Sequence, residues 1–83
     1  MSVALTQFYS PKQWNDWVMA IGRLVRGEGT DADAKLVDKR AQQDGRFEAE
    51  ESFREKRAQV LASYGLTPES VRQALDVLQD WDS

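Results

Sequence analysis

The side chains that could do chemistry in this chain are carboxylates and aromatic rings, because the sequence contains no histidine and no cysteine. Those two residue types supply most general bases at neutral pH, thiol nucleophiles and zinc ligands. We therefore expect no enzymatic activity, and we predict neither a catalytic residue nor a cofactor. The absence of cysteine also excludes a disulfide scaffold and fits a cytoplasmic protein.

Two groups of carboxylates invite a more specific reading. Asp31, Asp33 and Asp38 have the composition of a calcium loop, but the central glycine and closing glutamate of an EF-hand are missing. Asp31 and Asp33 are instead placed to stabilise the positive end of a helix. Glu50 and Glu51 do not form an acid/base pair, because adjacent helical residues do not face each other. We expect no metal site and no catalytic pair.

Two tryptophans, Trp14 and Trp17, stand three residues apart. If they were exposed, their rings would form a platform on which nucleic-acid bases stack. Ile21 and Leu24 continue the same helical spacing, however, and a stripe of this kind faces a core. We therefore expect both tryptophans to be buried.

The acidic C-terminal end has two interpretations. Asp80 and Asp82 flank Trp81, and Asp76 lies one helical turn before Asp80. In one interpretation this is a frayed, solubilising terminus in which Trp81 closes the core. In the other, the three carboxylates and the ring form a contact site for a basic partner, with the ring as an aromatic anchor.

Helices must position these residues, and the strongest signal for one is at Ser10. Serine at the cap, Pro11 at the first helical position and Gln13 at the third mark a helix start. Apolar residues then recur every three or four positions. This pattern predicts a helix from Pro11 to Arg26.

Two further helices have weaker signals. One begins after the cap Thr30 and has a thin apolar face, with Arg40 among its solvated residues. The other spans Phe47–Tyr64, with Tyr64 on the core-facing side. On that side Glu50 and Arg57 either pair at the rim of the core or project beyond it.

The last helix opens at Thr67 and Pro68, and its inward stripe comprises Val71, Ala74, Leu75, Leu78 and Trp81. No segment has the period of a strand. We predict an all-α fold, a small bundle of three to four short helices, in one domain over residues 1–83. Residues 1–9 form either an extended arm or a short helical turn. The core is small, so self-association would help stability, and no apolar run approaches the ~20 residues of a membrane span.

The segment Tyr64–Leu75 resembles the turn and recognition helix of helix-turn-helix repressors of the GntR type, in which a tight turn and a Thr cap precede a Val-Arg-x-Ala-Leu run. The resemblance implies DNA binding through the last helix. It departs from the family at Leu61, where such motifs have alanine. The same pattern also joins any two consecutive helices.

Charge argues against DNA as the first choice. Residues Pro68–Ser83 hold four acids and one base, Arg72, whereas Met1–Thr67 holds ten of each, so the net charge of −3 lies in the helix that would approach DNA. DNA-binding proteins place positive charge there. We therefore predict a protein-binding adaptor, regulator or inhibitor, with a DNA-binding regulator as the alternative.

Overall fold

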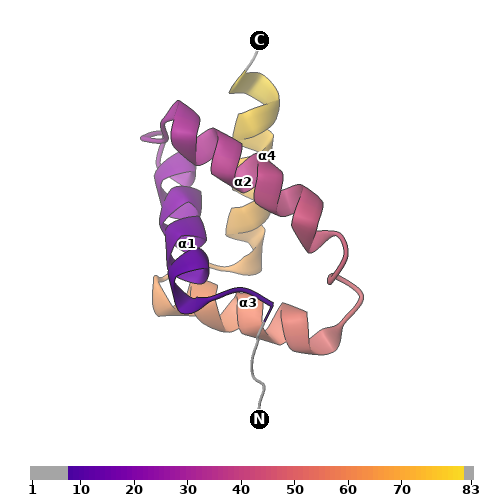
Figure 1. Ribbon diagram of the computed structural model, residues 1–83. Helices are drawn as coiled ribbons and strands as arrows, with labels where there is room; N and C mark the ends of the chain where they lie inside the picture. The colour runs from indigo at the N-terminus through magenta and orange to yellow at the C-terminus, as the bar shows by residue number, and fades with distance from the viewer. Residues whose placement is uncertain (1–7, 82–83) are drawn as a thin grey trace.

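The computed structural model describes residues 8–81, which form four α-helices joined by short links (Figure 1). The helices are α1 (Pro11–Val25), α2 (Asp31–Asp44), α3 (Glu51–Ser63) and α4 (Pro68–Trp81). No strand occurs between residues 8 and 81. The predicted all-α fold, a small bundle of short helices, is confirmed.

The first two helices begin with the caps that the sequence indicates. In α1 the Ser10 hydroxyl accepts the Gln13 N–H at 3.2 Å, while the Gln13 side chain accepts the Ser10 N–H at 2.9 Å. Thr30 and Asp33 form the same reciprocal pair at the start of α2, at 3.2 and 3.1 Å. Both helix starts are therefore determined locally, by side chains that satisfy otherwise unpaired backbone donors.

Glycines in the left-handed region end α1 and α3. Gly27 has φ 81° and Gly65 has φ 73°, a conformation that costs glycine little. After α3, the Leu66 N–H reaches back to the Leu61 carbonyl at 2.9 Å. This closed turn leads directly into α4, which packs alongside α1 (Figure 1).

The hydrophobic core is built around α1, which contacts all three other helices. Trp14 is 3% exposed and Trp17 is 1% exposed, so the prediction that both are core residues is confirmed. Ile21 and Leu24 are buried beside them. The other helices contribute Val37, Phe53, Leu61 and Ala74.

The third helix begins later than predicted. It starts at Glu51, and residues 45–49 before it form turns, so a helical start at Phe47 is wrong. Phe47 still packs against the core, held there by ring contacts rather than by helical periodicity. Arg57 pairs with Glu48 in the turn, at 3.1 Å, instead of with Glu50. Glu50 caps α3 and lies two helical turns before Arg57, whereas the turn before the helix places Glu48 within hydrogen-bonding distance of Arg57.

Tyr64 lies at the C-terminal cap of α3 and is 48% exposed, so the expectation that it faces the core is wrong. Its hydroxyl donates a hydrogen bond to the Asn15 side chain of α1. The residue therefore links the end of α3 to α1 at the surface.

Of the predicted arm, residues 1–7 lie outside the described residues, and Phe8 and Tyr9 are partly buried against the core. Phe8 has φ 73°, which is uncommon for a residue other than glycine. The bend brings both rings to Phe47, with centroid distances of 5.0 Å for Phe8 and 6.1 Å for Tyr9. This end of the arm is neither helical nor free, because its two rings extend the aromatic core.

Candidate functional site

The predicted partner-binding residues Asp76 and Asp80 lie one turn apart on the exposed side of α4. Glu69, two turns before Asp76, extends this acidic side toward the start of the helix. Among residues 8–81, no cation forms an ion pair with any of these three carboxylates. Asp82, the last carboxylate of the predicted site, lies outside the described residues.

Trp81 lies on a different side of α4 from Asp80, because consecutive helical residues point about 100° apart. It is 37% exposed, so the expectation that it completes the inward stripe is wrong. Its indole Nε1 donates to Asp31 Oδ1 at 2.9 Å. This hydrogen bond fixes the ring between the end of α4 and the start of α2.

A groove with a volume of about 390 Å³ lies beside this ring, between α2 and α4. Its lining residues are Asp31, Ala34, Lys35, Asp38, Leu78 and Trp81. Asp31 and Asp38 are two turns apart and share one side of α2. Both are exposed, and the groove therefore combines an aromatic wall with two carboxylates and one amine.

This groove is not predicted by the sequence. The spacing of Asp31 and Asp38 on one side of a helix was visible in the sequence, and it was a usable signal. The contact of Asp31 with Trp81, fifty positions away in the chain, was not visible, since it depends on how α2 packs against α4. Of the predicted residues, the structure thus separates the outer carboxylates Asp76 and Asp80 from the groove at Trp81.

Asp33, a third carboxylate at the start of α2, faces α1 and is buried. Its two oxygens accept from Arg23 Nε at 2.8 Å and Arg23 Nη2 at 2.7 Å, in a bidentate pair. These hydrogen bonds from Arg23 lower the pKa of Asp33 from 3.8 to about 2. A carboxylate that stays ionised in this way is a structural anchor rather than a general acid or base at neutral pH.

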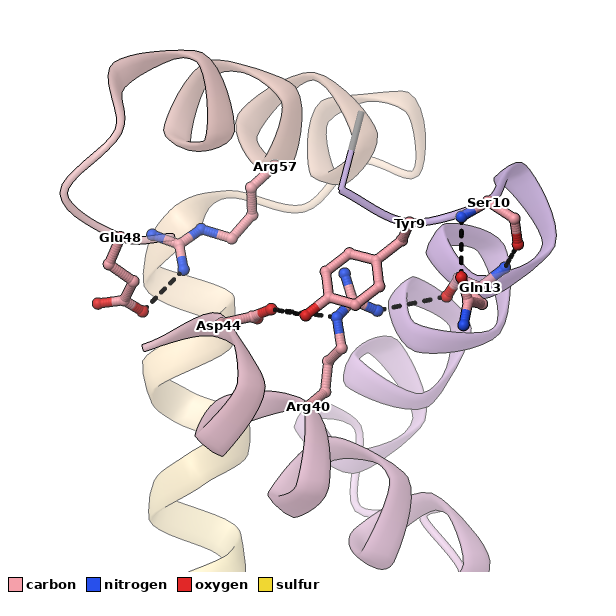
Figure 2. A network of polar contacts seen from close by, with 7 residues as sticks. All are labelled: Tyr9, Ser10, Gln13, Arg40, Asp44, Glu48 and Arg57. Carbon is pink, nitrogen blue, oxygen red and sulfur yellow. Dashed lines mark hydrogen bonds and ion pairs between the residues drawn. The ribbon is translucent and has the colours of Figure 1, made fainter. Parts of the chain in front are cut away.

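Arg40 was expected among the solvated residues of α2, but it is only 4% exposed. Its guanidinium carbon lies 3.5 Å from the centre of the Tyr9 ring and 4.5 Å from that of Trp14. Trp17 is 4.9 Å away. Asp44 accepts from Arg40 Nε at 3.1 Å (Figure 2). Aromatic faces and a carboxylate together offset the cost of burying this charge.

Tyr9 covers the Arg40 cluster, and its hydroxyl donates to Asp44 Oδ1 at 2.7 Å (Figure 2). Burial raises the pKa of Tyr9, and Asp44 raises it further, so the hydroxyl remains a donor at neutral pH. Arg40 Nη1 donates to the Gln13 carbonyl at 3.4 Å, whereas Nη2 has no acceptor within residues 8–81. The network connects the arm, α1 and α2, and its role is to stabilise the fold.

Comparison of the chain with protein-family models, with curated proteins and with solved structures found no match. Within the described residues, no three His, Cys, Asp or Glu side chains are grouped so as to hold a metal ion. No helix in that part of the chain is long and apolar enough to cross a bilayer. The features that bear on function are therefore the exposed side chains and the groove of the four helices.

Proposed function

We propose that this protein is a non-enzymatic binding module, an adaptor, regulator or inhibitor, whose partner is a protein with a basic surface. The proposed contact residues are Asp76, Asp80 and Trp81 of α4, together with Asp82, the next residue in the sequence. A cytoplasmic location fits a chain without cysteine. The observation that carries the proposal is that Asp76 and Asp80 are exposed on α4 and form no ion pair with any cation of the described residues, while Trp81 is partly exposed on another side of the same helix.

Physical considerations support this assignment. Carboxylates at Asp76 and Asp80 oppose each other at helical spacing, and Asp80 also lies at the negative end of α4. Each effect costs a few tenths of a kcal/mol. A basic partner would convert this repulsion into attraction, and it would mainly accelerate association. Trp81 adds the aromatic contact that is enriched where binding energy is concentrated.

Asp33 and Tyr9 have shifted pKa values, and both shifts favour a structural role over a catalytic one. Asp33 is held ionised by Arg23, and Tyr9 is held protonated beside Asp44. Neither has the pKa near neutrality that acid/base catalysis requires. Both instead connect α2 to its neighbours.

The alternative function is a helix-turn-helix DNA-binding regulator that reads DNA through α4. The order of α3, a turn at Gly65 and α4 matches the motif. The exposed side of α4, however, carries Asp76 and Asp80, while Arg72 is the only base of that helix. Phosphates would be repelled rather than bound. We therefore place DNA binding second.

A comparative pull-down from the native host tests the proposal. Wild-type protein and the double reversal Asp76→Lys, Asp80→Lys serve as paired baits, and Glu51→Lys, Glu55→Lys serves as a control that makes the same charge change on exposed positions of α3. We expect a defined protein to be retained by the wild type and the control but depleted on the double reversal. Equal retention of every captured protein by wild type and double reversal would contradict the proposal.

A further inference from the structure

We infer that the groove between α2 and α4 binds a cationic side chain, an arginine or lysine of the partner, against the Trp81 ring and between Asp31 and Asp38. The inference rests on the proposed function, because it names what the basic partner inserts. It concerns a place on the molecule that is distinct from the outer carboxylates Asp76 and Asp80.

The groove is large enough to admit a single side chain. Its volume of about 390 Å³ falls within the ~300–1,000 Å³ typical of ligand sites. Leu78 provides apolar surface for an aliphatic stem, and Trp81 provides an aromatic wall. The hydrogen bond from the indole to Asp31 holds the ring in place, so that little side-chain freedom is lost when a ligand binds.

The charges of the groove select a cation. Asp31 uses one oxygen for the Trp81 indole, and within the described part of the chain Asp38 accepts only a long hydrogen bond of 3.4 Å from the Gln42 amide. Neither carboxylate forms an ion pair within residues 8–81. They lie two turns apart on one helix, roughly 10 Å along its axis, so a cation between them can approach both.

Lys35 lines the same groove, one turn from each of these carboxylates, yet it pairs with neither within the described residues. An exposed lysine at this place would repel an incoming cation weakly. Replacing Lys35 by an uncharged residue therefore tests which charge the groove prefers, since a cation should bind more tightly and an anion more weakly.

The chain itself holds a guanidinium with the same chemistry. Arg40 lies against the rings of Tyr9 and Trp14 and donates to Asp44. The groove offers an aromatic ring and carboxylates without an arginine of its own. Trp81 is the best of the aromatic residues for such contacts, because indole attracts cations most strongly.

The probe is an acetylated, amidated pentapeptide with two arginines separated by glycines, and the same peptide with citrulline is the uncharged control. Binding is followed by ¹⁵N NMR at low salt, with the Trp81 indole signal assigned from the Trp81→Phe variant. We expect saturable shifts of the Trp81 indole in the wild type and of the backbone amides of Asp38 and Leu78, with the arginine peptide only.

Variants then give the expected order of affinity. Trp81→Ala should weaken the peptide roughly 3- to 30-fold, whereas Trp81→Phe keeps most of the affinity because it keeps a ring face. Asp38→Asn should weaken it roughly 2- to 5-fold, and Lys35→Ala should tighten it roughly 2- to 3-fold. Asp76→Asn, the same charge change outside the groove, should have a smaller effect than Asp38→Asn.

Two results would overturn the inference: shifts confined to Asp76 and Asp80, or an unchanged affinity in Asp38→Asn and Lys35→Ala. Neither result touches the proposed function, which is judged by the partner protein and the double reversal at Asp76 and Asp80. Conversely, a partner that the double reversal retains as well as the wild type does would contradict the proposed function. The groove could still bind the peptide in that case.

Discussion

Arg40 stabilises the protein from inside. Its charge is matched by Asp44, and its planar guanidinium lies against Tyr9 on one side of the cluster with Trp14 and Trp17 nearby. A buried ion pair adds little compared with apolar residues of the same volume, but it is costly to break from one side. Removing Arg40 alone is therefore costly, because the negative charge of Asp44 stays buried.

We predict that Arg40→Ala destabilises the fold by about 3–5 kcal/mol, because it leaves the Asp44 carboxylate buried without its charged partner. The adjacent exposed residue provides the control, since Lys39→Ala should change the free energy of unfolding by no more than about 0.5 kcal/mol. Urea denaturation followed by circular dichroism measures both. Similar values for the two variants would show that the Arg40 cluster is not a stabilising centre.

Asp33 gives the fold a pH dependence. Its pKa is lowered from 3.8 to about 2 in the folded protein, so its contribution is complete above pH 3.8 and is lost as the pH falls toward 2. The contribution should be about 1–2 kcal/mol once the partial exposure of Arg23 is allowed for. Wild type should exceed Asp33→Asn in stability by this amount at pH 7, and the difference should vanish near pH 2. A difference that is constant across denaturation curves from pH 7 to 2 would refute this account.

At the scale of elements, α1 organises the molecule because it supplies more buried residues than any other helix. Its apolar stripe faces those helices, and its opposite side carries Met19, which is 40% exposed. The division between the two sides follows from helical periodicity. Stability should therefore depend sharply on which side of α1 is changed.

We predict that Ile21→Ala, at a fully buried position, lowers the free energy of unfolding by about 2–5 kcal/mol. Met19→Ala, two residues away on the exposed side, should cost less than about 1 kcal/mol. Denaturant melts of the two variants make the comparison. If Ile21→Ala costs no more than Met19→Ala, this side of α1 is not packed and becomes a candidate binding surface.

Element starts and ends were predictable where local chemistry sets them, as at the Ser10 and Thr30 caps and at Gly65. The start of α3 was not, because Phe47 is apolar at helical spacing yet lies in a turn. Arg40 was also placed wrongly, since an arginine on a thin helical face is normally solvated. Only the tertiary contacts with Tyr9 and Asp44 make its burial favourable.

The candidate site was predictable only in part. The acidic side of α4, with Asp76 and Asp80, follows from spacing alone. The groove does not, because it requires Trp81 to meet Asp31 across the α2–α4 crossing. The sequence thus indicates which charges are exposed, and the packing of helices decides which of them face one another.

At the scale of the whole molecule, the charge of −3 is carried by residues 68–83, while the rest of the chain is balanced. This asymmetry predicts no appreciable binding to duplex DNA. In a mobility-shift assay with mixed genomic fragments at ~150 mM salt, we expect no discrete shifted band. A sequence-selective shift that Arg72→Ala abolishes would instead establish the DNA-binding alternative.

Binding of a basic partner by the acidic side of α4 is tested by the rate of association with the purified captured partner. In stopped-flow measurements at low salt, Asp76→Lys, Asp80→Lys should associate roughly 3- to 30-fold more slowly than wild type, with a smaller change in dissociation rate. The two proteins should converge as salt screens the charges. Equal association rates at low salt would contradict the claim and make Asp76 and Asp80 a solubilising surface only.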